Sequence, residues 1–311
     1  MAMDLAREKY SGSVYTLELG AGLESGGTRA HVIKAGGETT LPFLFEEGGM
    51  PNAPVAGLEI FDCEPAEWPD GLKAEFGDVI KDPLKWAKMC VSEFGSKFLC
   101  VRMMSVHPDW GSRPVAEAIE ILKAILKEVN VPLVVIGCGD IEKDNELLAK
   151  ASHAAKGERC LFGIASQNNY KTLTASCLAD GHSIIANSPV DVNIAKQVNI
   201  LISDMGLGPE RIVMDPTTAS LGYGMEYVYS IMERARLSAF SGDKMLAMPF
   251  ILFVGQEVWR VKEAKDSAAQ GAKWEIATAS AMLQTGADIL VMRHPAAFKA
   301  VTEYIDMMMK K

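Results

Sequence analysis

The stretch from residue 132 to residue 218 decides the fold, because it contains four strand-like runs at regular intervals. They read PLVVIGCG at 132–139, RCLFGIAS at 159–166, HSIIANSP at 182–189 and RIVMDPTT at 211–218. Each run is apolar almost throughout. This is typical of parallel strands that are covered on both faces, because a strand with one solvated face alternates apolar and polar residues.

Four further runs of the same kind lie on either side of this stretch. They are VAGLEIFD at 55–62, KFLCVRMMS at 97–105, PFILFVG at 249–255 and DILVMRHP at 288–295. The intervals leave room for a helix after each run. Alternating strands and helices predict a parallel sheet, and eight repeats favour its closure into a (β/α)8 TIM barrel. A doubly wound open sheet is the alternative, but such sheets more often have fewer strands.

The segments between the runs are predicted to be amphipathic helices. The clearest is EAIEILKAILKEVN at 117–130, whose apolar residues have helical spacing with charged residues between them. Those apolar positions are Ile119, Leu122, Ile125, Leu126 and Val129. Glycines stand where a helix end needs a left-handed residue, at Gly157, Gly181, Gly206 and Gly286. Residues 262–273 are predicted to be a loop before the seventh helix.

Residues 1–53 are expected to form an N-terminal extension and residues 54–311 the barrel, within a single domain overall. The runs VYTLELG at 14–20 and RAHVIKAGG at 29–37 are β-like and are joined by the glycine-rich AGLESGGT. They predict a β-hairpin that covers the N-terminal mouth of the barrel.

Composition excludes several classes of protein. Of the 311 residues, 49% are hydrophobic, which is ample for a large core, and the net charge is −9. The acidic balance argues against nucleic acid or an anionic membrane as a partner. The start MAMDLAREKYSGS lacks an apolar signal region, and no apolar segment approaches membrane-spanning length. We therefore expect a cytoplasmic protein.

The six cysteines are scattered and contain no C-x-x-C pair, so we expect no metal or iron–sulfur site within this chain. We also predict no catalytic residue. A lone cysteine at a strand end, such as Cys138, is more often structural than nucleophilic when no histidine can be assigned to it. The cysteines are Cys63, Cys90, Cys100, Cys138, Cys160 and Cys177.

The active face of a β/α barrel consists of residues at and just past the C-terminal strand ends. Here those positions are polar, mixed in sign, and rich in amides and hydroxyls, which suits a large, polar, uncharged ligand. Our candidates for cofactor binding are Gln167, Asn168, Asn169, Asn187, Asp215, Thr217, Thr218, Tyr223 and His294. Other positions in the ring include Asp62, Ser105, His107, Asp140, Gln256, Glu257 and Arg293.

Several candidates have a structural alternative as helix caps. The box SPVD at 188–191 can start a helix, His294 precedes a proline, and Asn168 or Asn169 can be an N-cap. These alternatives stay open. Asp215 is favoured as a ligand-facing residue, because an Asp-Pro at a strand end breaks the strand and aims the carboxylate into the mouth.

Two short motifs are set aside. GYG at 222–224 lacks the spacing and the lysine of a phosphate-binding loop, so it favours a turn or a close backbone approach. DGH at 180–182 resembles the start of the D-x-H-x-x-G signature that supplies a histidine ligand to cobalamin. However, Ile185 stands in place of the glycine, and the motif lies at the start of a strand.

A family resemblance covers most of the chain and is densest from about residue 132 to residue 295. It is carried by VVIGCGDIEKDNELL at 134–148, NNYKTLTA at 168–175, ANSPVDVNIAKQVNILISDMGL at 186–207, RIVMDPTTASLGYGMEYVYSIMERARL at 211–237 and ADILVMRHP at 287–295. Together these segments resemble the small subunit of the bacterial corrinoid iron–sulfur protein, which belongs to the carbon monoxide dehydrogenase/acetyl-CoA synthase system of the anaerobic acetyl-CoA pathway.

The resemblance implies a barrel related to pterin-binding methyltransferases, paired with a large subunit. That large subunit would carry a 4Fe–4S cluster and a corrinoid domain, with the cobalamin shared at the interface. The heterodimer would take methyl groups from methyltetrahydrofolate through a separate methyltransferase and pass them to acetyl-CoA synthase. The small subunit would then be a non-catalytic part of a methyl carrier, enclosing the cobalamin.

Two alternatives remain. The chain can be a methyltetrahydrofolate:corrinoid methyltransferase in its own right, with Asn187 and Asp215 holding a pterin and helping to protonate its N5 atom. It can also be a purely structural scaffold that never contacts the corrin.

Overall fold

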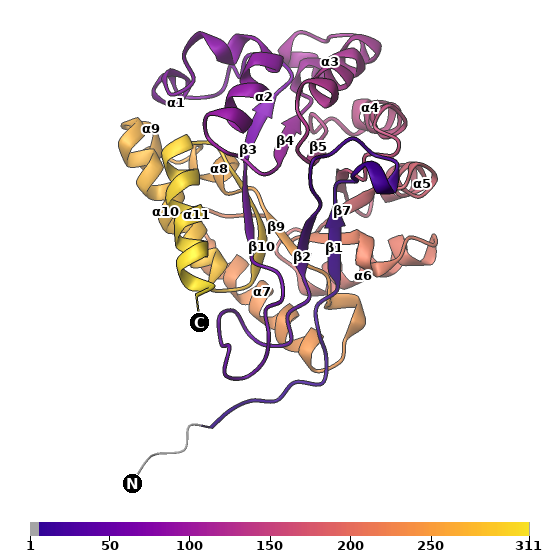
Figure 1. Cartoon of the computed structure of the whole chain (residues 1–311), viewed down its shortest axis with the longest axis vertical. Helices are drawn as coiled ribbons and strands as arrows, with labels where there is room; N and C mark the ends of the chain where they lie inside the picture. Colours follow the sequence, from indigo (N-terminus) through magenta and orange to yellow (C-terminus); the bar gives the residue numbers. More distant parts are fainter. Residues whose placement is uncertain (1–5, 311) are drawn as a thin grey trace.

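The computed structural model describes residues 6–310, in which eight parallel strands close into a barrel (Figure 1). The predicted (β/α)8 barrel is confirmed. Around the barrel the strands follow the order β10-β3-β4-β5-β6-β7-β8-β9. Their bounds are β3 Val55–Phe61, β4 Leu99–Arg102, β5 Leu133–Ile136, β6 Leu161–Ala165, β7 Ser183–Asn187, β8 Ile212–Asp215, β9 Phe250–Leu252 and β10 Ala287–Met292.

Helices surround the barrel and connect its strands. They are α1 Asp70–Ala74, α2 Pro83–Ser92, α3 Val115–Glu128, α4 Ile141–Ala154, α5 Tyr170–Asp180, α6 Val192–Asp204, α7 Met225–Phe240, α8 Val254–Val258, α9 Lys262–Lys265, α10 Ala268–Leu283 and α11 Pro295–Met308. The loop predicted over residues 262–273 is wrong. Ser267 caps α10 by accepting a hydrogen bond from Gln270 N at 3.1 Å, so the helix begins directly after it.

The predicted N-terminal hairpin is confirmed as β1 (Thr16–Leu19) paired antiparallel with β2 (Ile33–Gly36). Its apolar face, formed by Leu17, Leu19, Ile33 and Ala35, packs into one cluster with side chains from inside the barrel. Backbone bonds hold the hairpin against the N-terminal ends of the strands, where Gly20 N donates to Arg159 O at 2.8 Å. The hairpin therefore closes the N-terminal mouth, as predicted.

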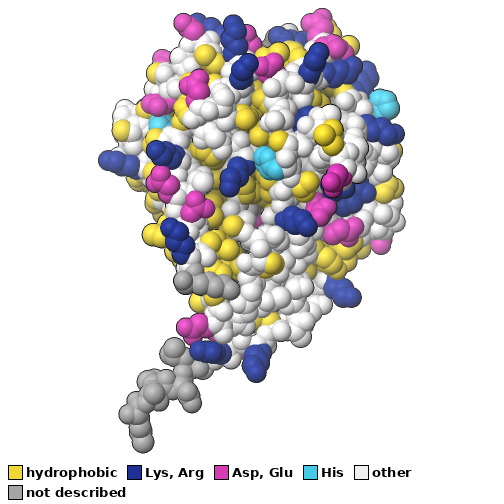
Figure 2. All heavy atoms as spheres, in the orientation of Figure 1, with side chains coloured by type: hydrophobic (Ala, Val, Ile, Leu, Met, Phe, Trp, Pro, Cys, Tyr) yellow, Lys and Arg dark blue, Asp and Glu magenta, His cyan; other side chains and the backbone are white. Residues whose placement is uncertain are grey.

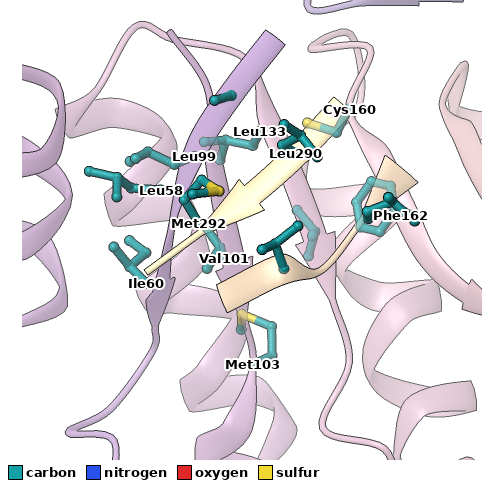
Figure 3. Packing of buried hydrophobic residues seen from close by; sticks show 14 of the residues in the cluster. Leu58, Ile60, Leu99, Val101, Met103, Leu133, Cys160, Phe162, Leu290 and Met292 are labelled. Carbon is teal, nitrogen blue, oxygen red and sulfur yellow. The ribbon is translucent and has the colours of Figure 1, made fainter. Parts of the chain in front are cut away.

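The strand residues that face the helices form the larger of two apolar cores. Leu58, Ile60, Leu99, Val101 and Met292 alternate along their strands and are fully buried (Figure 3). The apolar face predicted for residues 117–130 packs into the same core from α3. The predicted helix-end glycines all have positive φ, and Gly181 N closes the end of α5 on Cys177 O at 3.0 Å.

The strand residues that face the barrel axis change from apolar to polar along its length. The inward positions nearer the N-terminal ends of the strands are apolar, as in Cys100, Val134, Ile185, Val213 and Val291. Successive inward residues are two apart along a strand, so the next inward positions lie at the C-terminal mouth. Five of these positions are polar and form what we call the polar layer, which consists of Glu59, Arg102, Asn187, Asp215 and Arg293, whereas Ile136 is apolar.

On the face shown in Figure 2, basic and acidic side chains are interspersed over the surface. Among residues 6–310, no helix is long and apolar enough to cross a membrane.

Candidate functional site in the barrel mouth

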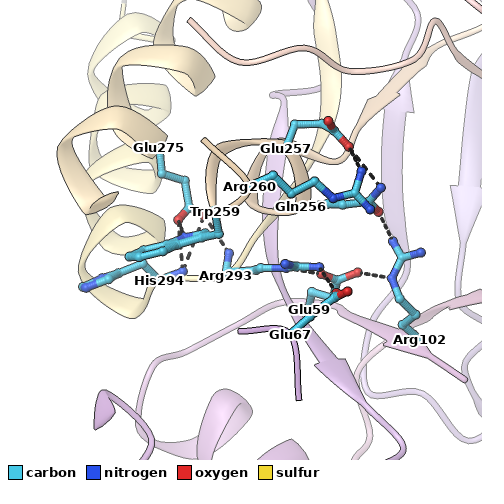
Figure 4. Close-up of polar contacts among 10 residues, drawn as sticks. All are labelled: Glu59, Glu67, Arg102, Gln256, Glu257, Trp259, Arg260, Glu275, Arg293 and His294. Atoms are coloured by element: carbon cyan, nitrogen blue, oxygen red, sulfur yellow. Dashed lines mark hydrogen bonds and ion pairs between the residues drawn. The ribbon is translucent and has the colours of Figure 1, made fainter. Parts of the chain in front are cut away.

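The centre of the polar layer is a buried Arg–Glu–Arg cluster. Glu59 is fully buried, and its two carboxylate oxygens accept from Arg102 Nε and Arg293 Nε, each at 2.6 Å (Figure 4). Burial opposes ionisation of Glu59, but the two guanidinium groups outweigh it and hold the pKa of this carboxyl below its ordinary value. The cluster keeps one net positive charge in the mouth.

This cluster continues across the mouth to α8. Arg102 Nη2 donates to Gln256 Oε1 at 2.5 Å, and Gln256 Nε2 donates to Glu257 Oε1 at 3.1 Å. Arg260 Nη1 reaches the same Glu257 oxygen at 2.8 Å (Figure 4). Polar contacts therefore link β3 and β4 to α8.

Arg293 is held between aromatic rings. Its guanidinium carbon lies 4.8 Å from the ring centroid of Trp68 and 5.5 Å from that of Phe61, a cation–π arrangement. Within residues 6–310 its Nη2 atom is buried without a hydrogen-bond partner, and Glu67 Oε1 lies 3.8 Å away. Its backbone N–H donates to Glu275 Oε1 at 2.6 Å, which fixes the end of β10.

A second group of polar side chains joins the ends of β7 and β8. Asn187 Nδ2 donates to Asp215 Oδ2 at 2.8 Å and to Thr217 Oγ1 at 3.1 Å. Asp215 Oδ1 accepts from Thr217 N at 3.0 Å. Burial, assisted by the nearby Glu257, raises the pKa of Asp215 to about 6, although Asn187, Thr217 and Arg102 act in the opposite direction. Asp215 thus titrates close to neutral pH.

The loops after β7 and β8 contain two β-branched residues in the left-handed region. Val190 has φ 51° and Thr217 has φ 67°. Thr217 Oγ1 donates to Ser188 O at 2.8 Å, and Val190 N donates to the same oxygen at 2.9 Å. Strained backbone persists only where its surroundings enforce it, and such strain gathers at functional sites. The two loops therefore hold Asn187 and Asp215 in a fixed arrangement.

A family model described as CO dehydrogenase/acetyl-CoA synthase delta subunit matches residues 18–306. The chain belongs to this family. It is 37% identical over 305 residues to the acetyl-CoA decarbonylase/synthase complex subunit delta of Methanopyrus kandleri, covering 96% of this chain and 76% of that protein. The corresponding subunit of Methanocaldococcus jannaschii is 34% identical, with 95% of this chain and 74% of that protein covered. The family predicted from the sequence is confirmed.

Solved structures show the same fold as this delta-subunit family member. A Xanthomonas albilineans dihydropteroate synthase, solved with indole-2-carboxylic acid and 6-chloroguanine, superposes with a TM-score of 0.57 at 14% identity. The superposition covers 84% of this chain and 95% of the synthase. At this identity the likeness supports the barrel fold alone.

Three of the predicted site residues, Gln167, Asn168 and Asn169, lie on the segment that follows β6. Gln167 and Asn168 are exposed, and Gln167 Nε2 donates to Gln197 Oε1 at 2.8 Å. Asn169 stands at the N-cap position of α5 but makes no capping bond. Its Oδ1 accepts from Ser166 N at 2.7 Å, so the side chain orders the end of β6.

The capping alternatives have different outcomes at the other two positions. His294 does cap α11, because its Nδ1 accepts from Ala296 N at 3.1 Å. Its ring stacks on Trp259 at a centroid distance of 5.9 Å, and Figure 4 shows it directed away from Arg102. The capping alternative at Ser188 does not hold, because Asp191 caps α6 by accepting from Asn193 N at 2.7 Å.

A buried carboxyl holds this corner of the mouth together. Glu275 Oε2 accepts from Trp259 Nε1 at 2.7 Å, while Oε1 accepts from the backbone of Arg293. Burial raises the pKa of Glu275 to about 7, against the effect of these donors. Burial also lowers the pKa of His294. In this corner, burial therefore favours the neutral forms of both Glu275 and His294.

Thr218 and Tyr223 lie on the loop between β8 and α7. Thr218 Oγ1 accepts from Phe253 N at 2.8 Å and joins this loop to the end of β9. Tyr223 is half exposed, and its hydroxyl donates to Glu263 Oε2 at 2.7 Å. Tyr223 N closes a turn on Ser220 O at 2.9 Å, so the turn predicted for GYG at 222–224 is confirmed.

Our candidate list missed Glu59 and Arg102, which form the centre of the mouth. Their signal was present in the sequence as a charged residue inside an otherwise apolar strand run, in VAGLEIFD and KFLCVRMMS. Buried charges are rare unless they are paired, so each of these positions implied a partner. The sequence does not identify that partner, however, because it lies on a different strand and comes near only when the barrel forms.

The motifs that were set aside have structural roles. His182 is buried, its Nδ1 accepts from Cys160 N at 3.1 Å, and its Nε2 lies 2.9 Å from Ser152 O. Burial raises the pKa of the Cys138 thiol to about 12, which disfavours the nucleophilic thiolate. In the described part of the chain, no group of three or more His, Cys, Asp or Glu could hold a metal ion.

Proposed function

We propose that this chain is the small subunit of a corrinoid iron–sulfur methyl carrier and that its C-terminal mouth encloses a corrinoid held by the large subunit. The observation that supports this most directly is a polar layer at the mouth of a barrel from the delta-subunit family. The 4Fe–4S cluster and the corrinoid domain would belong to the large subunit. A methyltetrahydrofolate:corrinoid methyltransferase and the carbon monoxide dehydrogenase/acetyl-CoA synthase would be the other partners, in the cytoplasm.

The donor set of the mouth fits a corrinoid. The rim of a corrin carries neutral carboxamide arms, which both donate and accept hydrogen bonds. Asn187 is partly exposed at the mouth, and its Nδ2 donates to Asp215, so its Oδ1 would be the atom that accepts from such an arm. Exposed Gln167 and Asn168 offer further amides on the neighbouring loop.

The residues of this chain would orient the corrinoid and keep water away from it. When bound, the corrinoid supplies the chemistry of accepting and releasing a methyl group. Asp215 is buried and bonded to Asn187 and Thr217, so in this role it would hold the Asn187 side chain in place. The buried Arg–Glu–Arg cluster keeps the mouth rigid beneath the ligand.

The test uses the heterodimer with the large subunit loaded with corrinoid. Substituting Asn187→Ala is expected to leave the chain folded, to change the cobalt absorbance spectrum, and to raise the rate of oxidation in air several-fold. The matched control is Glu18→Gln, which alters a polar residue at the opposite mouth. Unchanged spectra and oxidation rates for Asn187→Ala, Asp215→Ala and Thr217→Ala would favour a purely structural subunit and refute the proposal.

A second candidate function is methyl transfer by this chain itself. It is favoured by Asn187 donating to Asp215, whose pKa is about 6, because such a carboxyl can exchange a proton near neutral pH. The pair would hold a reduced pterin and assist protonation at N5. Methyl transfer from methyltetrahydrofolate to free cob(I)alamin, catalysed by this chain alone and lost in Asp215→Asn, would establish this function in place of the first.

A further inference from the structure

A cleft of about 610 Å³ lies at the N-terminal end of the barrel, next to the hairpin. One wall is formed by the hairpin, whose strand β1 lies beside β7 in Figure 1. The other wall is formed at the starts of β6, β7 and β8, which are neighbours in the barrel. The lining residues that decide what the cleft can bind are Glu18, Lys34, Arg159, Ser183, Glu210 and Arg211.

Two arginines give this cleft hydrogen-bond donors that the described residues leave unused. Arg159 Nη1 donates to Glu18 Oε2 at 2.6 Å, but its Nε and Nη2 atoms have no partner among residues 6–310. Arg211 donates through Nε to His182 O at 3.1 Å and through Nη2 to Cys177 O at 2.7 Å, which leaves Nη1 unpaired there. The unpaired nitrogens are open to solvent rather than buried. Guanidinium donors of this kind bind oxyanions well.

The two guanidinium groups also lie close enough to oppose each other. Burial lowers the pKa of Arg211, and the charge of Arg159 acts in the same direction. Cys177 and Glu210 act against this shift without cancelling it. An anion between the two arginines would relieve their repulsion.

The carboxylates of the cleft leave it with a positive charge. Glu18 is shared, because one of its oxygens accepts from Arg159 and the other lies 3.2 Å from Lys34 Nζ. Glu210 is exposed, so water screens its charge. The lining contains three basic and two acidic residues, which gives one net positive charge.

Ser183 adds a third donor between the two arginines. It is the first residue of β7, which lies between β6 and β8 in the barrel. Its hydroxyl makes no hydrogen bond within residues 6–310 and is not closed off from solvent. A phosphate group offers oxygens in a tetrahedral arrangement, whereas a carboxylate offers two in one plane. Donors from neighbouring strands therefore favour a phosphate over a carboxylate.

The donors are held in place before any ligand binds. Arg211 is fixed by the carbonyls at the end of α5, and the backbone of Arg159 accepts from Gly20 N at 2.8 Å. A preformed site loses less entropy on binding. The volume of the cleft exceeds that of a phosphate ion and lies within the range of small-molecule sites, so it leaves room for the rest of a ligand.

We propose that this cleft binds the phosphate group of a small phosphorylated molecule, with Arg159, Arg211 and Ser183 donating to its oxygens. The cleft lies at the opposite end of the barrel from the polar layer, so this inference is independent of the proposed function.

The experiment titrates the full chain with inorganic phosphate and, at matched ionic strength, with sodium chloride, and follows the midpoint of thermal unfolding. Phosphate is expected to raise the midpoint in a saturable way, whereas chloride is not. The double variant Glu18→Gln/Arg159→Gln keeps the net charge of the cleft but removes one guanidinium. It should weaken phosphate binding about tenfold or more, the effect of lost charge-assisted hydrogen bonds.

Two single variants should shift phosphate affinity in opposite directions. Ser183→Ala removes a hydroxyl that makes no hydrogen bond within residues 6–310, so it should leave the chain folded and weaken binding about three- to tenfold. Glu210→Gln removes an exposed carboxylate and should strengthen binding about two- to fivefold. The matched control is Glu146→Gln/Lys150→Gln, which removes an exposed ion pair on α4 and should leave phosphate binding unchanged.

Three outcomes would overturn the proposal. A midpoint that rises without saturation, or equally with chloride, would show a general effect of ions. Unchanged binding in both the double variant and Ser183→Ala would place any bound phosphate elsewhere. Equal weakening in the double variant and in the α4 control would show that the affinity does not depend on this cleft.

Discussion

The two mouths of the barrel are formed by the same eight strands but have opposite character. The N-terminal mouth is filled by the hairpin residues Leu17, Leu19 and Ile33, which extend the apolar interior. The C-terminal mouth presents the polar layer, in which Glu59 lies buried between two arginines. The difference agrees with the proposed function, in which the apolar end of the interior stabilises the fold and the polar end holds a ligand.

Backbone strain and a raised pKa also occur together in the loops after β7 and β8. Val190 and Thr217 adopt left-handed conformations there, and the pKa of Asp215 is raised. A chain selected for stability alone would relieve such strain with glycine. The variants below test whether apolar packing stabilises one mouth and buried polar groups are held at the other.

The largest effect is expected for Glu59→Ala. It removes the shared counter-charge of two buried guanidinium groups, so the free energy of unfolding should fall by about 3–5 kcal/mol. Chemical denaturation measures this loss. The matched control is Glu18→Ala at the other end, which breaks half-exposed pairs with Arg159 and Lys34 and should cost less than about 1 kcal/mol. Equal losses in the two variants would contradict the burial argument.

Leu17→Ala should destabilise the protein through the opposite mouth. Leu17 is fully buried in the hairpin, so its truncation leaves a cavity and should lower the free energy of unfolding by about 3 kcal/mol. Leu23→Ala, at an exposed turn of the same extension, serves as control and should change it little. The titration of Asp215, followed by NMR, should be unchanged in Leu17→Ala, because Asp215 lies at the other mouth. A shifted titration would show that the two mouths are coupled.

Asp215→Asn should change how stability depends on pH. The pKa of Asp215 is about 6 in the folded chain and 3.8 ordinarily, so the native state binds the proton more tightly. The contribution of Asp215 to wild-type stability is therefore greatest below about pH 4, falls as the pH rises to about 6, and then levels off. The asparagine variant lacks this loss, which amounts to about 2–3 kcal/mol. Denaturation curves at several pH values measure it, and parallel pH profiles would refute the buried, ionisable state.

The smallest effect is expected for Val190→Gly. Replacing a partly buried valine normally destabilises a protein, but here glycine also relieves the left-handed strain of roughly 1–2 kcal/mol. The net change in the free energy of unfolding should be below about 1 kcal/mol, as measured by denaturation. A loss above about 2 kcal/mol would mean that the loop is not strained at this position.

Much of the fold could be predicted from local patterns. Eight apolar runs, the α3 periodicity and the helix-end glycines each act over a few residues, where propensity and burial suffice. The exception at residues 262–273 was also local, since Ser267 is an N-cap signal that we did not use. Asp215 was singled out from its Asp-Pro sequence and does lie buried in the mouth.

The sequence by itself determined the barrel, its hairpin and the family. The tertiary structure alone decided which polar residues meet. Glu59 and Arg293 are bonded although 234 positions separate them, because barrel closure places β10 beside β3. It also decided that His294 caps a helix while Asn187 faces Asp215. Side-chain type and strand position are properties of short segments, whereas a hydrogen-bond partner depends on register, pleat and closure of the whole sheet.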